Sequence, residues 1–423
     1  MTRSIAALAL IVAAFATVAI AQPRLAVPAA AQASPSFDAK AATDAYLATV
    51  PADKKARSDA YFEGGYWIQL WAFLFGVAVL WLLLKTGLSA NMRDRAERLT
   101  TRRPLQTAAY AIQFVIVIGI AGFPLSVYTD FVREHQYGLA TQTFAGWFGD
   151  QAKGLAVSLV LGPVAITILY AVLRRVGRLW WLWATAVVVA LNIVAVAIAP
   201  VFILPLFNTY SPLTDARIRD PILSLARANG IPVDNVYVVD QSRQTTRISA
   251  NVSGFLGTTR ISLNDNLLRR GSLEEIEAVL GHEMGHYVLN HIRDAILESA
   301  LVILVGFAVV AFAFDELRQR HPEWRIGGVA DVAGVPLIAL LFSTYQFVAT
   351  PINNTIVRTH EYEADIFGLN AAGQPDGFAN ASLKLGEYRK LDPGPLEEII
   401  FFDHPGGRTR IFSAMRWKAE HLR

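Results

Sequence analysis

Residues 272–291 read SLEEIEAVLGHEMGHYVLNH. Ser272 and Glu275 have the spacing of a capping box, which predicts that a helix begins here. His282 and His286 lie four positions apart, so they share one face of that helix and can both point an imidazole at one ion. Glu283 lies about 100° further around the helix and can reach a water on that ion without binding it. This HExxH spacing predicts a metal site with a free acid beside it.

The composition restricts which metal chemistry is possible. The chain has 423 residues and no cysteine, so any metal must be held by histidine and carboxylate groups. We therefore expect one Zn²⁺ per chain, bound by His282 and His286, with Glu283 as the catalytic base. Zinc would lower the pKa of a bound water to about 7 and polarise a carbonyl group. Two histidines make an incomplete site, and a third ligand must come from elsewhere.

The rest of the chain is too apolar for an ordinary soluble enzyme. It is 53% hydrophobic and only 17% charged, and the apolar residues form long runs. A run of about 20 apolar residues is long enough to cross the ~30 Å hydrocarbon layer. Such runs occur at about 66–84, 105–128, 154–173, 179–205, 296–314 and 332–350. We predict a mainly α protein, a polytopic bundle with six or seven membrane spans.

The order of polar and apolar segments predicts the domains. Residues 1–22 have the pattern of a signal peptide or of a first membrane helix, and residues 23–65 that of an exposed polar segment. Residues 66–205 are expected to form the N-terminal membrane helices. Residues 206–423 are expected to form a gluzincin-like zinc peptidase domain that includes the last two spans. Two short β-rich stretches, NVYVVD at 235–240 and RISLND at 260–265, predict a small sheet in this domain.

Arginine-rich loops predict the orientation in a cell membrane. If every run spans the membrane, the connections at 85–104, 174–178 and 315–328 lie on one side, and all three are strongly basic. The 129–153 connection lies on the other side and has only Arg133 and Lys153. By the positive-inside rule the basic connections are cytoplasmic, which places His282 on the outer, periplasmic face. The basic residues are Lys85, Arg93, Arg95, Arg98, Arg102, Arg103, Arg174, Arg175, Arg178, Arg318, Arg320 and Arg325. Because they flank apolar runs and the net charge is only +3, they predict a lipid bilayer as partner and no nucleic acid.

The third ligand is sought in VRTHEYEADIFGLN, residues 357–370, which follows the last apolar run. Glu361 and Asp365 share a helix face, so Glu361 could bind zinc while Asp365 orients a ligand histidine. Glu363 lies on another side and is expected to be solvated, and His360 is a further candidate. His291 lies off the face of the 272–291 helix that carries His282 and His286, so we expect it at the surface.

At this point the sequence resembles the type I CAAX prenyl proteases, a family of integral-membrane zinc metalloproteases, as a bacterial member. GHEMGH resembles the zinc helix of that family, and RTHEYEAD resembles its R-x-x-E-x-x-A-D element. The resemblance implies that Glu361 is the third ligand and that Asp365 supports a ligand histidine. FFDHPGGRTRI, residues 401–411, is similar to the H-P-x-x-x-x-R-[IL] element, which implies that His404 stabilises an oxyanion and Arg410 braces the site.

The likeness covers most of the chain from about residue 65, with one departure. The family has N-A-[YF]-x-x-G before its RI strand, and this chain has SANVSG. Ser249, Ala250 and Asn251 are therefore the candidate substrate-binding residues, through backbone pairing with an extended peptide. The resemblance implies seven spans, with residues 4–22 as the first. It also implies a cytoplasmic active site, as in the eukaryotic members, which is opposite to the orientation that the charges predict.

These patterns predict a metalloendopeptidase that hydrolyses a peptide or protein substrate. A membrane quality-control protease resembling the HtpX group is an alternative, although more apolar runs precede residue 206 than that group has. A transporter or scaffold with a structural metal site is another, but such sites usually have four protein ligands and no spare acid. The sequence does not define an oligomeric state.

Overall fold

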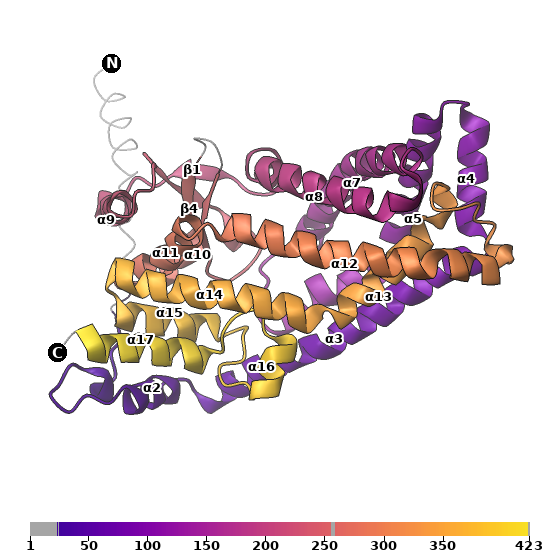
Figure 1. Cartoon of the computed structure of the whole chain (residues 1–423). Coiled ribbons are helices and arrows are strands. Elements are labelled where there is room, and N and C mark those ends of the chain that lie inside the picture. Colours follow the sequence, from indigo (N-terminus) through magenta and orange to yellow (C-terminus); the bar gives the residue numbers. More distant parts are fainter. Residues whose placement is uncertain (1–22, 24, 255–258, 422–423) are drawn as a thin grey trace, which may run out of the picture.

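The computed structural model describes residues 23, 25–254 and 259–421. The molecule is an elongated bundle with the small sheet and several helices gathered at one end (Figure 1). Residues 1–22, predicted as a signal peptide or first span, lie outside the described part of the chain.

Long apolar helices form the bundle. In the described residues, five helical stretches are long and apolar enough to cross a membrane, and a bent helix pair would be a sixth. The bent pair, Val332–Val348 followed by Thr350–Ala372, turns by 58° at its break. The five are Ala52–Lys85 (α3), Arg103–Gln136 (α5 to α6), Phe144–Leu173 (α7), Gly177–Leu206 (which includes α8) and His291–Arg320 (α12). The predicted polytopic, mainly α protein is thus confirmed, and a seventh span would need the residues outside the described part.

Two of these stretches change from α-helix to π-helix near a proline. Helix α5 (Arg103–Ser126) contains Pro124, and a π-helical segment, Val127–Val132, follows before the short α6 (Arg133–Gln136). Helix α8 (Trp180–Ile198) passes into a second π-helical segment that contains Pro200. A proline has no amide hydrogen to donate to the preceding turn, so the backbone rearranges locally.

The remaining helices are shorter. Helix α4 (Leu88–Leu99) connects α3 to α5 at the end of the bundle remote from the sheet (Figure 1). The others lie mostly around the sheet: α2 (Ala39–Ala48), α9 (Ala216–Ala228), α10 (Asp265–Arg270), α11 (Leu273–Val288), α13 (Val335–Val348), α14 (Thr350–Ala372), α15 (Pro375–Leu385), α16 (Pro395–Phe401) and α17 (Gly407–His421).

A mixed four-stranded sheet lies beside α11. Its strands are β1 (Tyr210–Pro212), β2 (Val236–Val239), β3 (Ala250–Ser253) and β4 (Arg260–Asn264), in the order β1-β2-β4-β3. β2 and β4 are parallel and correspond to the two predicted strands, whereas β3 pairs antiparallel with β4, with Ala250 opposite Leu263. Among the described strands, β3 is therefore an edge strand, and such an edge can pair with an extended segment of another chain.

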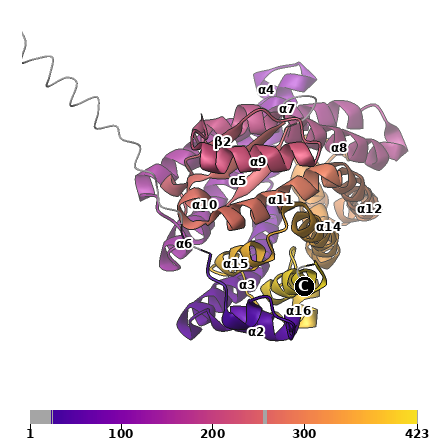
Figure 2. The same cartoon turned by 90° about the vertical axis from the view of Figure 1, so that its left-hand side faces the viewer.

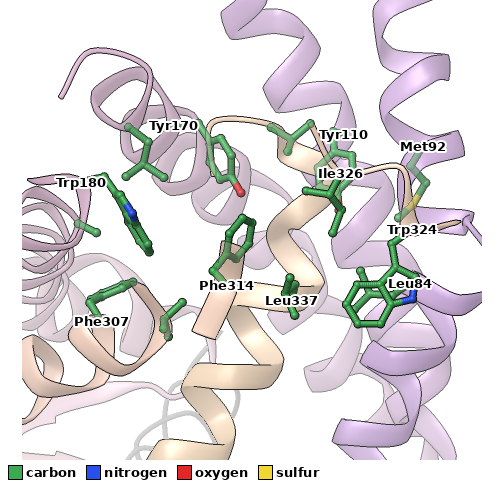
Figure 3. Close-up of a cluster of buried hydrophobic side chains, with 14 of the residues drawn as sticks. Leu84, Met92, Tyr110, Tyr170, Trp180, Phe307, Phe314, Trp324, Ile326 and Leu337 are labelled. Atoms are coloured by element: carbon green, nitrogen blue, oxygen red, sulfur yellow. The ribbon is translucent and has the colours of Figure 1, made fainter. Parts of the chain in front are cut away.

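Three apolar clusters hold these parts together. The first joins the membrane helices at the end remote from the sheet and includes Tyr110, Tyr170 and Trp324 (Figure 3). The second fills the space between the sheet, α9 and α11. The third joins α2 to α15 and α17, which lie together in the end-on view (Figure 2).

The third cluster contains residues of the segment 23–65, which the sequence predicts as exposed and polar. Tyr46 is fully buried, and its hydroxyl donates to Asp376 at 2.8 Å. Lys418 of α17 donates to the carbonyl of Ala31. From Ala52 onward the segment is the first part of α3. A few small or aromatic residues within the polar sequence thus pack α2, while most other described residues of the segment are exposed or half-buried.

Candidate active site and metal centre

The site is built on two helices that lie unusually close together. A Cβ atom placed on Gly281 of α11 would come within 3.0 Å of the carbonyl oxygen of Gly368 in α14. Gly285, one turn further along α11, lies equally close to the backbone of Ala364. Because glycine has no side chain at these positions, the two backbones approach each other, and side chains beside the contact point into a common space.

Helix α11 begins as the sequence predicts. Ser272 is its N-cap, and the capping box with Glu275 is complete: the Glu275 carboxylate accepts from the Ser272 amide at 2.7 Å. Lys384 of α15 also donates to Glu275, which ties the start of the helix to the neighbouring layer. This fixed starting point determines which face of α11, and therefore which histidines, point at α14.

His282, His286 and Glu361 converge at that contact. The Nε2 atoms of the two histidines are 3.1 Å apart. One Glu361 oxygen lies 3.3 Å from Nε2 of His282, and the other lies 3.4 Å from Nε2 of His286. Three ligand atoms of a tetrahedral zinc site, each about 2.0–2.1 Å from the ion, would be about 3.3 Å from one another. One ligand atom from each of the three side chains can be chosen so that all three lie within 4.8 Å of one another, so the cluster is suited to a zinc ion.

Asp365 and Arg410 support this cluster from behind. Oδ1 of Asp365 lies 2.8 Å from Nδ1 of His282, where it can accept the ring N–H and so direct Nε2 toward the ligand cluster. Arg410 of α17 donates to both oxygens of Asp365, with Nε at 2.9 Å from Oδ2. Both residues are buried. The arrangement holds the imidazole orientation through two side chains from different helices.

Electrostatics at the site favour a cation. Burial alone would lower the pKa of His282, but the carboxylates of Asp365 and Glu361 raise it to about 9. Burial also raises the pKa of Glu283, and the nearby histidines only partly offset this effect. A carboxylate with a raised pKa is a better proton acceptor, which suits a general base.

His404 also reaches the cluster. Its Nε2 lies 3.1 Å from a Glu361 oxygen, and its Nδ1 lies 2.8 Å from Asp403. Arg358 of α14 donates to the carbonyl oxygens of Glu398 and Phe402, at 2.8 and 2.6 Å. It thereby fixes the turn that leads to His404, which gives a structural reason for an arginine three residues before Glu361.

A cleft of about 400 Å³ opens onto these residues. Its lining includes His282, Glu283, Glu361, His404 and Arg410. Two of the three predicted substrate-binding residues, Ser249 and Ala250, line the same cleft at the start of edge strand β3. Asn251 is exposed and is not part of the lining.

The prediction for His291 is wrong, because this residue is 4% exposed rather than at the surface. Its Nδ1 lies 3.0 Å from Nδ1 of His286, and its Nε2 lies 3.1 Å from a Glu363 oxygen. Glu363 itself is exposed, as expected, but has a partner. His360 stacks on His291 and pairs with Glu298, so it is not part of the ligand cluster.

The structure adds cleft residues that the sequence patterns do not indicate. Arg247 lines the cleft and donates to Glu134 and to the Tyr61 hydroxyl, both at 2.7 Å. Tyr388 lies below the Arg247 guanidinium, 5.0 Å away. These side chains come from α3, α6 and two separate loops. No spacing in the sequence connects them, and only the fold brings them together.

A membrane helical bundle joined to a helix with an HExxH element, with a carboxylate from a second helix beside its two histidines, defines an integral-membrane metalloprotease. Comparisons with known proteins agree. Residues 39–209 match the family described as CAAX prenyl protease N-terminal, five membrane helices, and residues 212–418 match peptidase family M48. The chain belongs to peptidase family M48 and has the membrane domain of the CAAX prenyl proteases.

Individual relatives support the same conclusion. The chain is 30% identical to the uncharacterized metalloprotease YhfN of Bacillus subtilis, over 81% of this chain and 82% of that one. It is 30% identical to CAAX prenyl protease 1 of Saccharomyces cerevisiae, over 69% and 68% of the two chains. The crystal structure of S. mikatae Ste24p has the same fold, with a TM-score of 0.72, 24% identity and coverage of 86% and 89%.

Family membership decides between the alternatives that the sequence left open. A transporter or scaffold with a structural metal site is excluded as the main function, because the chain is a metalloprotease. The match of residues 39–209 to the CAAX prenyl protease membrane domain also favours this type of M48 peptidase over the HtpX group.

Proposed function

We propose that the chain is a zinc endopeptidase in which His282, His286 and Glu361 hold a single ion. The observation that carries this proposal is the close approach of their ligand atoms: the two Nε2 atoms are 3.1 Å apart, and the two Glu361 oxygens lie 3.3 and 3.4 Å from one Nε2 atom each. A zinc ion bound there would polarise the scissile carbonyl and acidify a water. Two imidazoles and one carboxylate form a ligand set that is common in catalytic zinc sites.

The protein's own residues have distinct roles in this proposal. Glu283 takes a proton from the attacking water and passes it to the leaving amine. His404, beside Glu361 in the cleft, donates a hydrogen bond to the oxygen that becomes negatively charged. Asp365 and Arg410 act as positioning residues, because they hold His282 and are themselves held by each other.

The substrate we propose is a peptide in extended conformation. In the part of the chain that the structure describes, no strand pairs with the outer edge of β3. Ala250 begins this strand and, with Ser249 directly before it, lines the cleft. A peptide that adds to this edge would be fixed by backbone hydrogen bonds at Ala250, because the backbone groups of Ser249 and Asn251 face β4. The names of the relatives refer to CAAX prenyl proteases, so C-terminal peptides are the first substrates to test.

Replacement of the base tests the enzymatic role. Glu283→Gln should retain zinc and lose peptide cleavage by at least about 100-fold. Glu420→Gln, which changes an exposed acid of α17, is the matched control and should keep most activity. Equal digestion of a peptide by Glu283→Gln and the parent would refute the proposed base. Peptides retained by Glu283→Gln can then be identified to define the substrate.

We also propose that the cleft faces the outer side of the membrane, because the arginine-rich connections lie at the opposite end of the bundle (Figure 1). A reporter fused after Arg423 tests this orientation. Alkaline phosphatase, which is active only outside the cytoplasm, should be active in this fusion, and green fluorescent protein should not fluoresce. The opposite pair of results would place the cleft in the cytoplasm, as the eukaryotic relatives imply.

A further inference from the structure

The end of the bundle remote from the cleft has a large excess of positive charge that the protein does not neutralise. Five basic side chains there pair with carboxylates: Lys85, Arg93, Arg318, Arg320 and Arg325. Among the described residues, seven arginines of the α3–α5 and α7–α8 connections have no carboxylate within ion-pair distance. They are Arg95, Arg98, Arg102, Arg103, Arg174, Arg175 and Arg178.

Two of these unpaired arginines line a pocket. The pocket has a volume of about 340 Å³ and lies between α4, the start of α5, the turn after α7 and the segment before α13. Its polar lining includes Arg103, Arg174, Thr107, Gln106 and Glu97. A Nη2 hydrogen of Arg174 is donated to the Thr107 hydroxyl at 2.8 Å, which directs the guanidinium along the pocket wall.

Arg174 lies in an environment that disfavours its positive charge, whereas Arg103 is exposed. Burial, together with the nearby charge of Arg103, lowers the pKa of Arg174. Arg174 is half-buried beside a second cation and donates to the Thr107 hydroxyl. The Asp331 carboxylate, which also lines the pocket and pairs with Arg93, only partly offsets the repulsion, so an anion would stabilise the site. An anion between Arg103 and Arg174 would remove that repulsion.

Hydrogen bonds that do not involve Arg103 or Arg174 hold part of the pocket wall. Arg93 donates to Asp331 at 2.6 Å and to the carbonyl of Arg325 at 2.9 Å. Tyr110 shares a 2.7 Å hydrogen bond with Ser89, which in turn donates to the carbonyl of Ala333. Beneath them lies the first apolar cluster (Figure 3), which includes Met92, Tyr110, Tyr170, Trp324 and Ile326. A shaped site with two unsatisfied cations is therefore already present.

The position of the pocket identifies the anion. Arg103 begins one candidate membrane span, and Arg174 directly follows another, so both lie at the depth of lipid headgroups. Guanidinium groups match the geometry of phosphate oxygens. The Gln106 side-chain amide, which gives one hydrogen to the Thr100 carbonyl, has a second hydrogen to donate. Basic pockets between membrane helices are suited to the headgroups of anionic lipids. We propose that this pocket binds the phosphate of an anionic phospholipid through Arg103 and Arg174.

Lipid titration of the purified full-length chain in neutral detergent tests the proposal. Phosphatidylglycerol should raise the midpoint of thermal unfolding at lower concentration than phosphatidylcholine with the same acyl chains. The double variant Arg103→Gln/Arg174→Gln should need about 30-fold more phosphatidylglycerol for the same shift. The control Arg318→Gln/Arg320→Gln also removes two arginines at this end, both paired and outside the pocket, and should bind as the parent does.

A third variant and a second ligand complete the experiment. Glu97→Gln removes the unpaired acid of the lining and should tighten binding about fivefold, so the proposal remains testable if the double variant does not fold. Inorganic phosphate should shift the midpoint only at far higher concentration than the lipid. Equal binding of the two lipids, an unchanged double variant, or saturation by inorganic phosphate below the lipid concentration would each overturn the lipid site.

Discussion

Gly368 of α14 lies directly against the backbone of His282 in α11. A Cβ atom on Gly368 would come within 2.7 Å of the His282 amide nitrogen, a distance that side chains do not tolerate. The contact places Glu361, two turns earlier on α14, at the ligand histidines. The active site therefore depends on the glycines that allow α11 and α14 to approach each other as well as on the metal-binding side chains.

This relationship predicts the effect of one methyl group. Gly368→Ala should push α14 away from α11, lower the free energy of unfolding by about 1–3 kcal/mol and reduce zinc content. The loss is measured by thermal unfolding and metal analysis of the purified protein. Gly149→Ala, in α7, is the control, because nothing lies within 4 Å of its Cβ position. A Gly368→Ala protein with parental stability and full zinc would contradict the packing argument.

The ligand assignment predicts a difference between two acids of one helix. Glu361→Ala should lose most of its zinc, because a buried ligand 3.3 Å from His282 is removed. Glu363→Ala should retain most of it, because that side chain is exposed and contacts His291 only. Metal analysis after dialysis against a weak chelator measures both. Full occupancy in Glu361→Ala would move the third ligand to another residue.

The buried pair of Asp365 and Arg410 predicts a large and asymmetric effect. Arg410→Gln leaves the Asp365 carboxylate buried without its cation and should cost about 3–5 kcal/mol of stability. The double variant Arg410→Gln/Asp365→Asn should be more stable than Arg410→Gln alone, because no uncompensated charge remains. Arg416→Gln, at an exposed position of the same helix, is the control. Additive losses in this double-mutant cycle, measured by chemical unfolding, would show that the two side chains are not coupled.

His291 is expected to act on the metal through His286. With Nε2 of His286 facing the ligand cluster, its Nδ1 hydrogen is available to Nδ1 of His291, whose Nε2 hydrogen is available to Glu363. Loss of such a partner typically weakens metal binding about 10- to 100-fold. His291→Ala should therefore release zinc to a competing chelator at about 10-fold lower chelator concentration or less. His321→Ala, an exposed histidine paired with Glu323, should behave as the parent.

The spacing of residues along the sequence determined the helices of this protein and which site residues share a helix face. Helix periodicity alone places His282 and His286 on one face, the capping box fixes the start of α11, and the long apolar runs require membrane helices. Glu361 and Asp365 share a face for the same reason. These relationships act within a few helical turns, so they are present in the sequence itself.

Tertiary structure decided the rest, and His291 shows why. On a continuous helix this residue would point away from His286, but Asn290 has a left-handed backbone (φ 60°), so α11 ends and α12 starts in a new direction. That change of direction brings His291 back to His286. The approach of α14, the burial of Tyr46 and the pocket at Arg174 likewise depend on contacts between residues far apart in the chain. Such contacts follow from packing in three dimensions, which no local periodicity specifies.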